Sequence, residues 1–440
     1  MTDAAILLRD GRPIDRACFF RAAGRLADRF AAFPGEPVMP LCSRPGDLAL
    51  SLVAADRTDR PVIIPHDDDP RAIDRVREGR PGAIVTRSAE DPPFEGAHTL
   101  VLEAALVDGP AGGDPPTDPL GPPDWRDDLR VTLYTSGSTG TPVGHAHGPR
   151  FLAAAARGWG ALLELDKGPI SLIPTVPSQH MFGFETCVLL PLGAPTATVM
   201  DSRPFFPADI RRALAEAPGR RVLITTPLQL RALVKAGGTP PAVDRVISAT
   251  APLSAELARA AEEMLEAPVV EIYGSTETGM LAARRTAHED AFAPRGDVTL
   301  TIGADGAAQV HCAHLPADFV LQDRLELAGD GRRFTLVGRN TDILKVAGKR
   351  ASLAGLTASL LAVPGVKDGA IAHDPEADTD EATRPVALVV PEPGTTAAGI
   401  RRALRERVPA VFVPRRILLV EALPRTGVGK LRAEDLAALI

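Results

Sequence analysis

The chain has 440 residues, of which 45% are hydrophobic, so it can bury a core without disulfides or a structural metal and is long enough for roughly two to four domains. Its formal net charge of −7 is modest for this length and gives no electrostatic reason to expect nucleic acid or an anionic membrane as a partner. The four cysteines form no CxxC pair, which argues against a zinc site and a disulfide framework and fits a reducing compartment.

The N-terminal segment meets charged residues after only a few apolar ones, which is too short for the apolar region of a secretory signal. No stretch of the chain approaches the ~20 apolar residues that a membrane span requires. We therefore expect a cytoplasmic protein without a membrane span.

Residues 1–108 have the pattern of a mixed α/β region. Helical spacing is present at 26–33, and short apolar runs at 60–66 and 82–87 predict buried strands. At 108–124 the density of Pro and Gly excludes a regular element, which predicts a surface linker.

Strands and helices alternate along the next part of the chain, and this alternation predicts a mainly parallel sheet covered by helices on both faces. The last helix of the series has Ser254 as its expected N-cap. The expected strands are 131–136, 171–176, 196–201, 221–226, 245–250 and 269–274, and the expected helices are 150–165, 209–217, 228–236 and 254–267.

After about residue 290 the pattern changes to short strands separated by turn signals, which predicts a small antiparallel subdomain at about 290–338. A compact module of strands and helices follows from Arg339 onward. The predicted fold class is α/β. It comprises a large N-terminal domain, 1–338, of mainly parallel sheets with that antiparallel subdomain, and then a small, mobile α+β C-terminal domain, 339–440.

The strongest local motif is LYTSGSTGTP at 133–142, where a strand runs into a loop of glycines and hydroxyls. Glycine lets the backbone approach a ligand closely, and successive N–H groups form a nest for phosphate oxygens. The segment is not a Walker A loop, because no Lys-Ser or Lys-Thr follows its glycines. The alternative interpretation is a flexible surface loop.

A second motif, IYGSTET at 272–278, lies at the end of an expected strand. Ligands of open α/β sheets bind at the carboxyl ends of strands, and Mg²⁺ takes one or two carboxylates together with phosphate oxygens. Glu277 is therefore a candidate for the metal of a bound nucleotide, and a helix cap box is the alternative.

A third motif, PRTGVGKLR at 424–432, places Lys430 on a glycine-flanked loop. Such a loop can move and deliver a point charge to a phosphate. A solvated loop lysine is the alternative.

Together these motifs resemble the adenylate-forming superfamily of acyl-CoA synthetases, amino-acid-activating domains and luciferases. The resemblance runs from about Leu133 to Lys430, in the family's order. It is carried by LYTSGSTGTP, PSQHMFG, SATAPLS, IYGSTE, LVGRNTDILKVAGKR and LPRTGVGK. It implies an AMP-forming acid–thiol ligase that uses ATP and Mg²⁺. The acyl group would pass to the thiol of CoA or of the phosphopantetheine of an acyl carrier protein.

The resemblance also assigns roles to single residues. Lys430 would contact the acyl carboxylate and the α-phosphate, Thr276 and Glu277 would hold the phosphates and Mg²⁺, and Asp323 with Arg339 would bind the ribose. The other nucleotide-binding residues that it implies are Thr135, Ser136, Gly137, Ser138, Thr139, Gly140, Ala249, Thr250, Ala251, Tyr273, Gly274 and Ser275. Its substrate-pocket residues are His180, Met181, Phe184 and Gly274, and its thiol-channel residues are Lys345 and Gly348.

Some positions depart from the family's pattern. Val143 stands where the phosphate loop usually ends in Lys, so one cationic contact to the leaving pyrophosphate is missing. Thr341 sits at the hinge position, where Asp or Lys is commoner. His145 and His147 share one face of a strand, but no third metal ligand is in view, and His147 matches the family's structural His after the loop.

The segment around His180 bears on the choice of acid. Amino-acid-activating members have Asp where this chain has Met181, and an apolar Met cannot pair with an α-amino group, so we expect a different kind of acid. Phe182 and Phe184 suit an aromatic ring, or else pack the core. The segment is similar to that of the stand-alone ligases of aryl polyene pathways, which load hydroxybenzoate-like or cinnamate-like acids onto a carrier protein.

The expected partners are thus a small carboxylic acid and an acyl carrier protein. A basic run at 401–416 suits an acidic carrier protein, and a solvated helix face is the alternative. Two other functions remain open. One is a sensor or decayed paralogue that binds nucleotide or acyl-adenylate without turnover. Val143 and the unusual Val320-Leu321-Gln322 before Asp323 favour it, and the presence of Glu277 and Lys430 opposes it. The other is an adenylate formed for attack by an amine.

Overall fold

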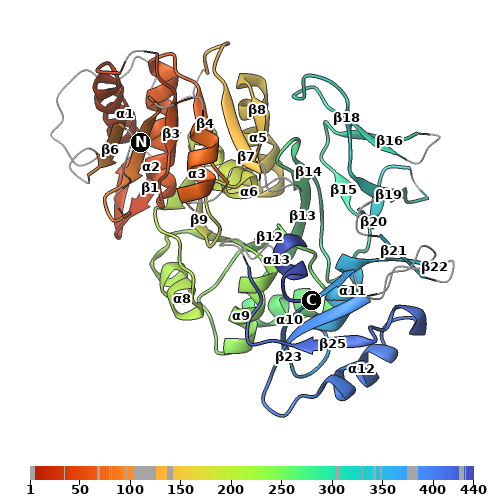
Figure 1. Ribbon diagram of the computed structural model, residues 1–440. Coiled ribbons are helices and arrows are strands. Elements are labelled where there is room, and N and C mark those ends of the chain that lie inside the picture. Colours follow the sequence, from red (N-terminus) through yellow and green to blue (C-terminus); the bar gives the residue numbers. More distant parts are fainter. Residues whose placement is uncertain are drawn as a thin grey trace. The chain divides into compact units, whose positions relative to one another are not determined.

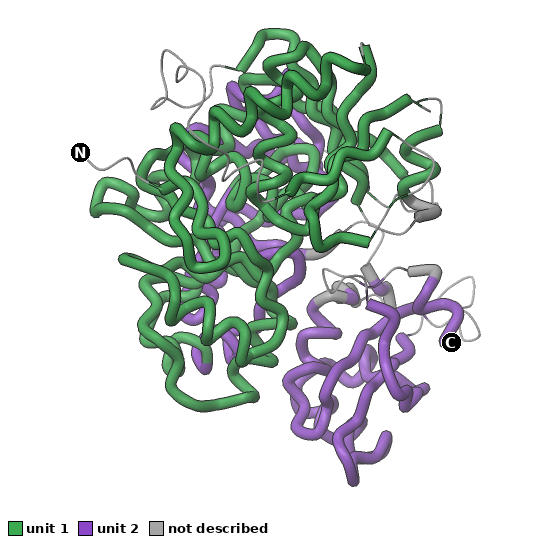
Figure 2. The backbone as a smooth tube through the Cα atoms, turned by 90° about the vertical axis from the view of Figure 1, so that its left-hand side faces the viewer, with its two compact units in different colours: residues 1–248, 261–281 green, residues 249–260, 282–440 purple. Residues whose placement is uncertain are grey.

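The computed structural model consists of two compact units, residues 1–248 with 261–281 and residues 249–260 with 282–440 (Figure 2). The expected linker at 108–124 lies entirely outside the described residues, and the expected domain boundary after residue 338 stays a prediction. The structure describes residues 5–33, 35–66, 70–78, 80, 82–92, 94, 98–103, 125–135, 142–303, 307–329, 331–339, 343–346, 349–373, 385–425, 431 and 433–440.

The first unit contains a six-stranded sheet with the order β6-β5-β3-β4-β7-β8 (Figure 1). All of its pairings are parallel except that of β7 with β8. Strands β3, β4 and β5 are buried along their whole length; β3 and β4 are apolar throughout, whereas β5 ends in Thr86, Arg87 and Ser88. The apolar stretches at 60–66 and 82–87 correctly predict β4 and β5. The elements are β3 Val38–Pro40, α2 Pro45–Arg57, β4 Val62–Ile64, α3 Pro70–Arg77, β5 Ile84–Ser88, β6 His98–Leu102, β7 Val131–Thr135 and β8 Val143–His147.

A second sheet of this unit runs in the order β13-β12-β11-β9-β10-β1-β2. Its pairings are parallel from β13 to β1, and β1 with β2 forms an antiparallel hairpin. The strands are β1 Ala5–Arg9, β2 Arg12–Asp15, β9 Ile170–Pro174, β10 Ala197–Met200, β11 Arg220–Thr225, β12 Arg245–Ser248 and β13 Val269–Ser275. The helices are α1 Arg16–Phe30, α5 Pro149–Leu162, α6 Met181–Phe184, α7 Leu190–Gly193, α8 Pro207–Glu216 and α9 Pro227–Ala236.

Two elements pass from one unit to the other along the chain: α10, Ala255–Leu265, and β14, Gly279–Arg284. Ser254 precedes α10 and its hydroxyl accepts a hydrogen bond from the Leu257 N–H at 3.2 Å, so the predicted N-cap is confirmed.

The second unit is built from small sheets. Strands β16-β17-β18, β19-β20 and β21-β22 pair antiparallel, and in β23-β24-β25 the last pair is parallel. Helices α11 and α12 pack on the last sheet through a core that includes Leu360, Val389, Leu404 and Phe412. The strands are β15 Ala293–Pro294, β16 Thr299–Ile302, β17 Ala308–His311, β18 Phe319–Val320, β19 Asp323–Leu327, β20 Phe334–Arg339, β21 Ile343–Val346, β22 Lys349–Ser352, β23 Val366–His373, β24 Pro385–Pro391 and β25 Arg416–Leu419. The helices are α11 Leu353–Leu361, α12 Ala397–Arg405 and α13 Ala433–Ala437.

The predicted fold class is therefore confirmed: mainly parallel sheets with helices, small antiparallel sheets after them, and an α+β module at the C-terminal end. In the part of the chain that the structure describes, no helix has the length and apolar character needed to cross a membrane.

A buried ion cluster ties β1 to the start of α2 and the end of β10. The Arg9 guanidinium donates to both Asp47 and Asp201, and the Gly46 N–H donates to Asp201 Oδ1 at 2.7 Å. Asp201 is fully buried and Asp47 is 1% exposed. Burial and the neighbouring Asp201 charge raise the pKa of Asp47 to about 6, although Arg9 opposes the shift.

We expect the free energy of unfolding to depend on pH through the protonation of Asp47. Because the folded-state pKa of Asp47 lies above its unfolded value of 3.8, its contribution is fully present below pH 4 and is lost as pH rises through 6. The loss is up to about 3 kcal/mol, at 1.36 kcal/mol per pKa unit. Denaturation of the wild type and of Asp47→Asn between pH 4 and pH 7 measures it. Stability curves that stay parallel over this range would contradict the assignment.

Candidate active site

Strand β7 ends where the glycine- and hydroxyl-rich loop begins. Its alternating residues bury Val131 and Leu133 and lead to Thr135, the last residue before that loop. Strand β8 returns antiparallel, with Val143 opposite Thr135 and His145 opposite Leu133. Of the residues assigned to the loop, Ser136, Gly137, Ser138, Thr139 and Gly140 lie outside the described part of the chain.

The imidazole of His145 lies between two predicted site residues. Its Nε2 is 3.1 Å from Thr135 Oγ1 and 3.7 Å from Glu277 Oε1. The His145 side chain is 17% exposed and that of Glu277 is 33% exposed. The structure therefore brings the first and second motifs together, although they are far apart in the sequence.

A second histidine of β8 contacts the same turn. His147 Nε2 lies 2.9 Å from the carbonyl oxygen of Thr276, and its ring stacks on Phe151 with the ring centroids 3.9 Å apart. His147 is 5% exposed. This packing is that of a structural histidine, which agrees with the role that the sequence comparison suggested for it.

The turn between β13 and β14 carries Thr276 and Glu277. A Cβ on Gly274 would lie 2.2 Å from the carbonyl oxygen of Gly279, so only glycine permits this close approach of the two strands. Ser275 Oγ and Thr278 Oγ1 lie 3.1 Å apart and close the turn. Tyr273, just before it, is 8% exposed.

A buried carboxylate anchors the same turn from a different element. Glu185 is 2% exposed and accepts hydrogen bonds from the Met280 N–H at 3.2 Å and from the Trp159 indole N–H at 3.3 Å. Gly279 has φ +65, and a Cβ there would lie 2.3 Å from Glu185 Oε1. Sequence reasoning assigned no role to Glu185. The sequence feature that could have identified Glu185 is its charge inside the apolar run HMFGFETCVLL, because a buried charge requires a partner.

Glu185 also begins a π-helical turn, Glu185–Leu189, which follows α6. The predicted pocket residues precede it: His180 is the N-terminal flanking residue of α6, Met181 is 7% exposed and Phe184 is fully buried. π-helical turns are frequent at functional sites. Burial raises the pKa of Cys187 in this turn to about 12, so its thiol is not a nucleophile at neutral pH.

The remaining assigned residues that are described belong to the second unit. Asp323 and Arg339 are directly opposite each other in the backbone register of the β19–β20 pair, and their role in ribose binding stays a prediction. Lys345 lies on β21, opposite Arg350. Gly348 and Lys430 are outside the described residues.

The predicted adenine-facing segment follows β12. Ala249 is 7% exposed and Ala251 is exposed. Thr250 between them has φ +78. A β-branched residue in this conformation is strained, and such residues cluster at functional sites.

The donor set of the turn fits Mg²⁺ of a nucleotide. Mg²⁺ is usually held by one or two carboxylates with substrate phosphates, rather than by an all-protein cage. Glu277 supplies one partly exposed carboxylate of this kind. Over the described ranges, no group of three or more His, Cys, Asp or Glu side chains is placed to hold a metal by itself.

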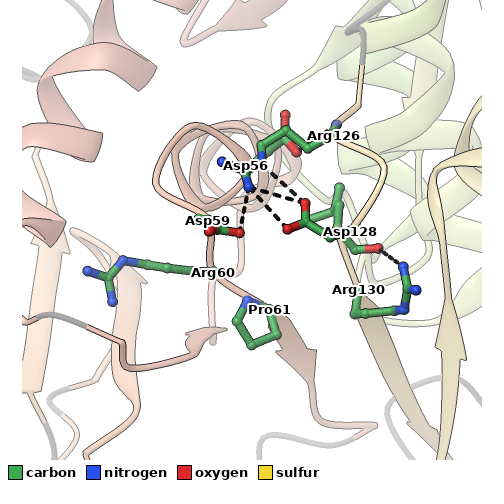
Figure 3. A pocket seen from close by; sticks show the side chains of 8 residues that line it. Asp56, Asp59, Arg60, Pro61, Arg126, Asp128 and Arg130 are labelled. Carbon is green, nitrogen blue, oxygen red and sulfur yellow. Dashed lines mark hydrogen bonds and ion pairs between the residues drawn. The ribbon is translucent and has the colours of Figure 1, made fainter.

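A hollow of about 220 Å³ lies elsewhere in the first unit (Figure 3). Arg126 bridges two of its acidic side chains, with contacts of 2.7 Å to Asp59 and 3.1 Å to Asp128, and so offsets part of their charge. None of the predicted site residues lines it. The lining residues are Asp56, Asp59, Arg60, Pro61, Arg126, Asp128, Leu129 and Arg130.

Comparison with known proteins adds independent information. The family model described as AMP-binding enzyme matches residues 38–305, and that of the AMP-binding enzyme C-terminal domain matches residues 358–430. A 4-coumarate–CoA ligase of Rhodobacter capsulatus is 32% identical over 70% of this chain and 76% of its own length. An isonitrile lipopeptide synthase of Streptomyces coeruleorubidus is 27% identical over 98% of this chain, which spans 32% of that protein.

The fold also matches solved structures. The o-succinylbenzoate–CoA synthetase of Bacillus subtilis superposes with a TM-score of 0.82 at 16% identity, in its complex with ATP and magnesium and in its complex with the acyl-adenylate. The match covers 99% of this chain in both cases, with 97% and 95% of the respective chains. At this level of identity, the likeness concerns the fold alone.

Proposed function

The chain belongs to the AMP-binding enzyme family, and from this premise we propose that it activates a carboxylic acid with ATP as an acyl-adenylate and then transfers the acyl group to a thiol. The family match also confirms the resemblance to adenylate-forming enzymes that the motifs showed. A single observation carries the proposal for this chain: the ring of His145 lies beside both Thr135 and Glu277, which supports the assignment of the phosphate-loop motif and the metal motif to one site.

In the first half-reaction, a carboxylate oxygen of the acid attacks the α-phosphorus of ATP and the bond to the β-phosphate oxygen breaks, releasing pyrophosphate. The reaction brings anions together, so the residues must offset repulsion and the charge of the transition state. The loop that begins after Thr135 would donate to phosphate oxygens, and Thr276 and Glu277 would hold the phosphates and the metal. Bound Mg²⁺ would neutralise phosphate charge. Lys430 holds the carboxylate and the α-phosphate together.

The acid itself is proposed to be an aryl or other non-amino acid. Met181 is apolar and 7% exposed, so it offers nothing to a substrate ammonium group. Relatives named as 4-coumarate–CoA and hydroxybenzoate–CoA ligases support an aryl acid by analogy. The narrower proposal is a ligase of the aryl polyene type.

In the second half-reaction, a thiol sulfur attacks the acyl carbon, AMP leaves and the thiol proton passes to solvent. Burial raises the pKa of Cys187 to about 12, which makes this thiol beside the predicted pocket residues a poor acceptor and supports the proposal of an external thiol. CoA and the phosphopantetheine of a carrier protein both supply one. We propose that residues 339–440 form the mobile domain that brings Lys345 and Gly348 to the thiol channel for this step.

Pyrophosphate release with Mg²⁺-ATP and a panel of acids tests the proposal. We expect release with hydroxybenzoates or cinnamates and none with amino acids, because Met181 cannot pair with an α-amino group. Medium-chain fatty acids complete the panel, and CoA or a carrier protein is then added to the active pair. ATP binding without release for any acid would favour a non-turnover sensor, and release with an amino acid would contradict the role given to Met181.

A further inference from the structure

We propose that His145 is a positioning residue that links the phosphate loop to the metal carboxylate and so takes over part of the ordering that a cation at position 143 would provide. This inference rests on the proposed function and adds a residue to it. A lysine is expected at position 143, but Val143 is 47% exposed and has no charge or donor. The site must therefore order its phosphate contacts by other means.

The geometry of β7 and β8 puts His145 in reach of both parts of the site. Val143 and His145 lie on the same face of β8, and Thr135 faces Val143 across the strand pair. From this face, His145 Nε2 lies 3.1 Å from the Thr135 hydroxyl and 3.7 Å from Glu277 Oε1. His145 Nε2 thus contacts Thr135, the residue just before the phosphate loop. The same atom also faces the Glu277 carboxylate, which is assigned to the metal.

The directions of these hydrogen bonds are part of the proposal. The Thr135 hydroxyl donates to the Val143 carbonyl oxygen at 3.5 Å, so its oxygen can accept from the ring. We assign a proton to His145 Nε2, because an N–H at this atom also suits the Glu277 carboxylate, which is an acceptor when ionised. A donor at this position favours a single placement of Thr135 Oγ1 and Glu277 before nucleotide binds, which reduces the cost of ordering them.

Other roles for His145 are less well supported. Its ring is partly exposed and does not pack in the core, in contrast to His147, which is 5% exposed and stacks on Phe151. A metal bound by the protein alone would require further ligands, and the described part of the chain holds no such cluster. The contacts of His145 thus favour orientation of its two neighbours.

Substitutions of His145 by side chains of different length test this role. His145→Gln can place an amide N–H near the position of Nε2, whereas His145→Asn and His145→Ala cannot. We expect the Ala and Asn variants to bind ATP about tenfold more weakly in the presence of Mg²⁺, the loss expected for about one hydrogen bond. Gln should stay within about threefold of the wild type. Calorimetry of ATP binding, with and without Mg²⁺ and without any acid, measures this.

The substitutions of His145 should change the KM for ATP and not the KM for the acid. We expect KM for ATP to rise in the Ala and Asn variants while KM for the acid stays within about twofold, because each interaction lost is to a nucleotide-binding group. His311→Ala is the matched control. His311 also lies on an antiparallel strand and contacts a threonine across it, with Nε2 2.8 Å from Thr301 Oγ1, but it belongs to the β16-β17-β18 sheet.

The outcomes separate this inference from the proposed function. If the wild type binds ATP and releases pyrophosphate but the Ala and Asn variants match it, the role of His145 is wrong and the function stands. Equal losses in the Gln, Asn and Ala variants would also overturn it, because a donor at the right reach should rescue binding. A wild type that does not bind ATP would overturn both.

Discussion

Lys430→Ala is expected to lower the rate of acyl-adenylate formation by about 10²–10³, which corresponds to ~2.7–4 kcal/mol of lost transition-state stabilisation. Lysine is a compact point charge on a flexible stem, and two glycines, Gly427 and Gly429, precede it in the sequence. In the proposed reaction this charge holds the attacking carboxylate against the α-phosphate. No other residue is assigned to both anions, so its removal should have the largest effect on this step.

The second half-reaction should survive this substitution. Thioester formation from supplied acyl-adenylate does not require the approach of two anions, so we expect a rate within about twofold to threefold of the wild type. Lys367→Ala, at an exposed position of β23, controls for the loss of a lysine from the same region of the sequence. Equal losses in both half-reactions would contradict a two-step model in which Lys430 serves only the first.

Glu185→Ala is expected to reduce both stability and adenylation. It removes the acceptor of two buried donors, the Trp159 indole N–H and the Met280 N–H, each of which costs ~1–3 kcal/mol when left unpaired. We therefore expect the free energy of unfolding to fall by about 2–5 kcal/mol. Because Met280 follows the turn that carries Thr276 and Glu277, we also expect adenylation by the folded protein to fall by about 10²-fold, as for a misplacement of ~1 Å.

Two further variants separate the effect of Glu185 on adenylation from its effect on stability. Glu185→Gln keeps one acceptor oxygen and should lose less in both measurements. Trp159→Phe removes one donor and leaves the bond to Met280, so it should reduce stability with little effect on adenylation. Denaturation and pyrophosphate release at saturating ATP measure the two effects. If Glu185→Ala is destabilised but its folded fraction reacts at the wild-type rate, Glu185 does not position the turn.

Much of the fold was predictable because it depends on local patterns. Strands β4 and β5 lie in short apolar stretches of the sequence, and Ser254 caps its helix through a hydrogen bond to a residue only three positions away. The sequence patterns did not predict the π-helical turn at 185–189 or the close approach of Gly274 to Gly279. Both depend on neighbours that are distant in the sequence.

The sequence by itself determined the family, the order of the motifs and the residue types that the chemistry needs: hydroxyls and glycines for phosphates, Glu277 for a metal and Lys430 for two anions. It also showed that Val143 breaks the pattern. Such information is carried by short segments, and each can be recognised without its surroundings.

Only the tertiary structure decided which of these segments meet. The antiparallel return of β8 and the end of β13 place His145 between Thr135 and Glu277. The helix after His180 brings Glu185 to the N–H of Met280, which follows the turn that carries Glu277. These contacts join residues that are ten to more than a hundred positions apart. The physical reason is that sheet register and helix packing, rather than any local pattern, determine which polar side chains share a buried space.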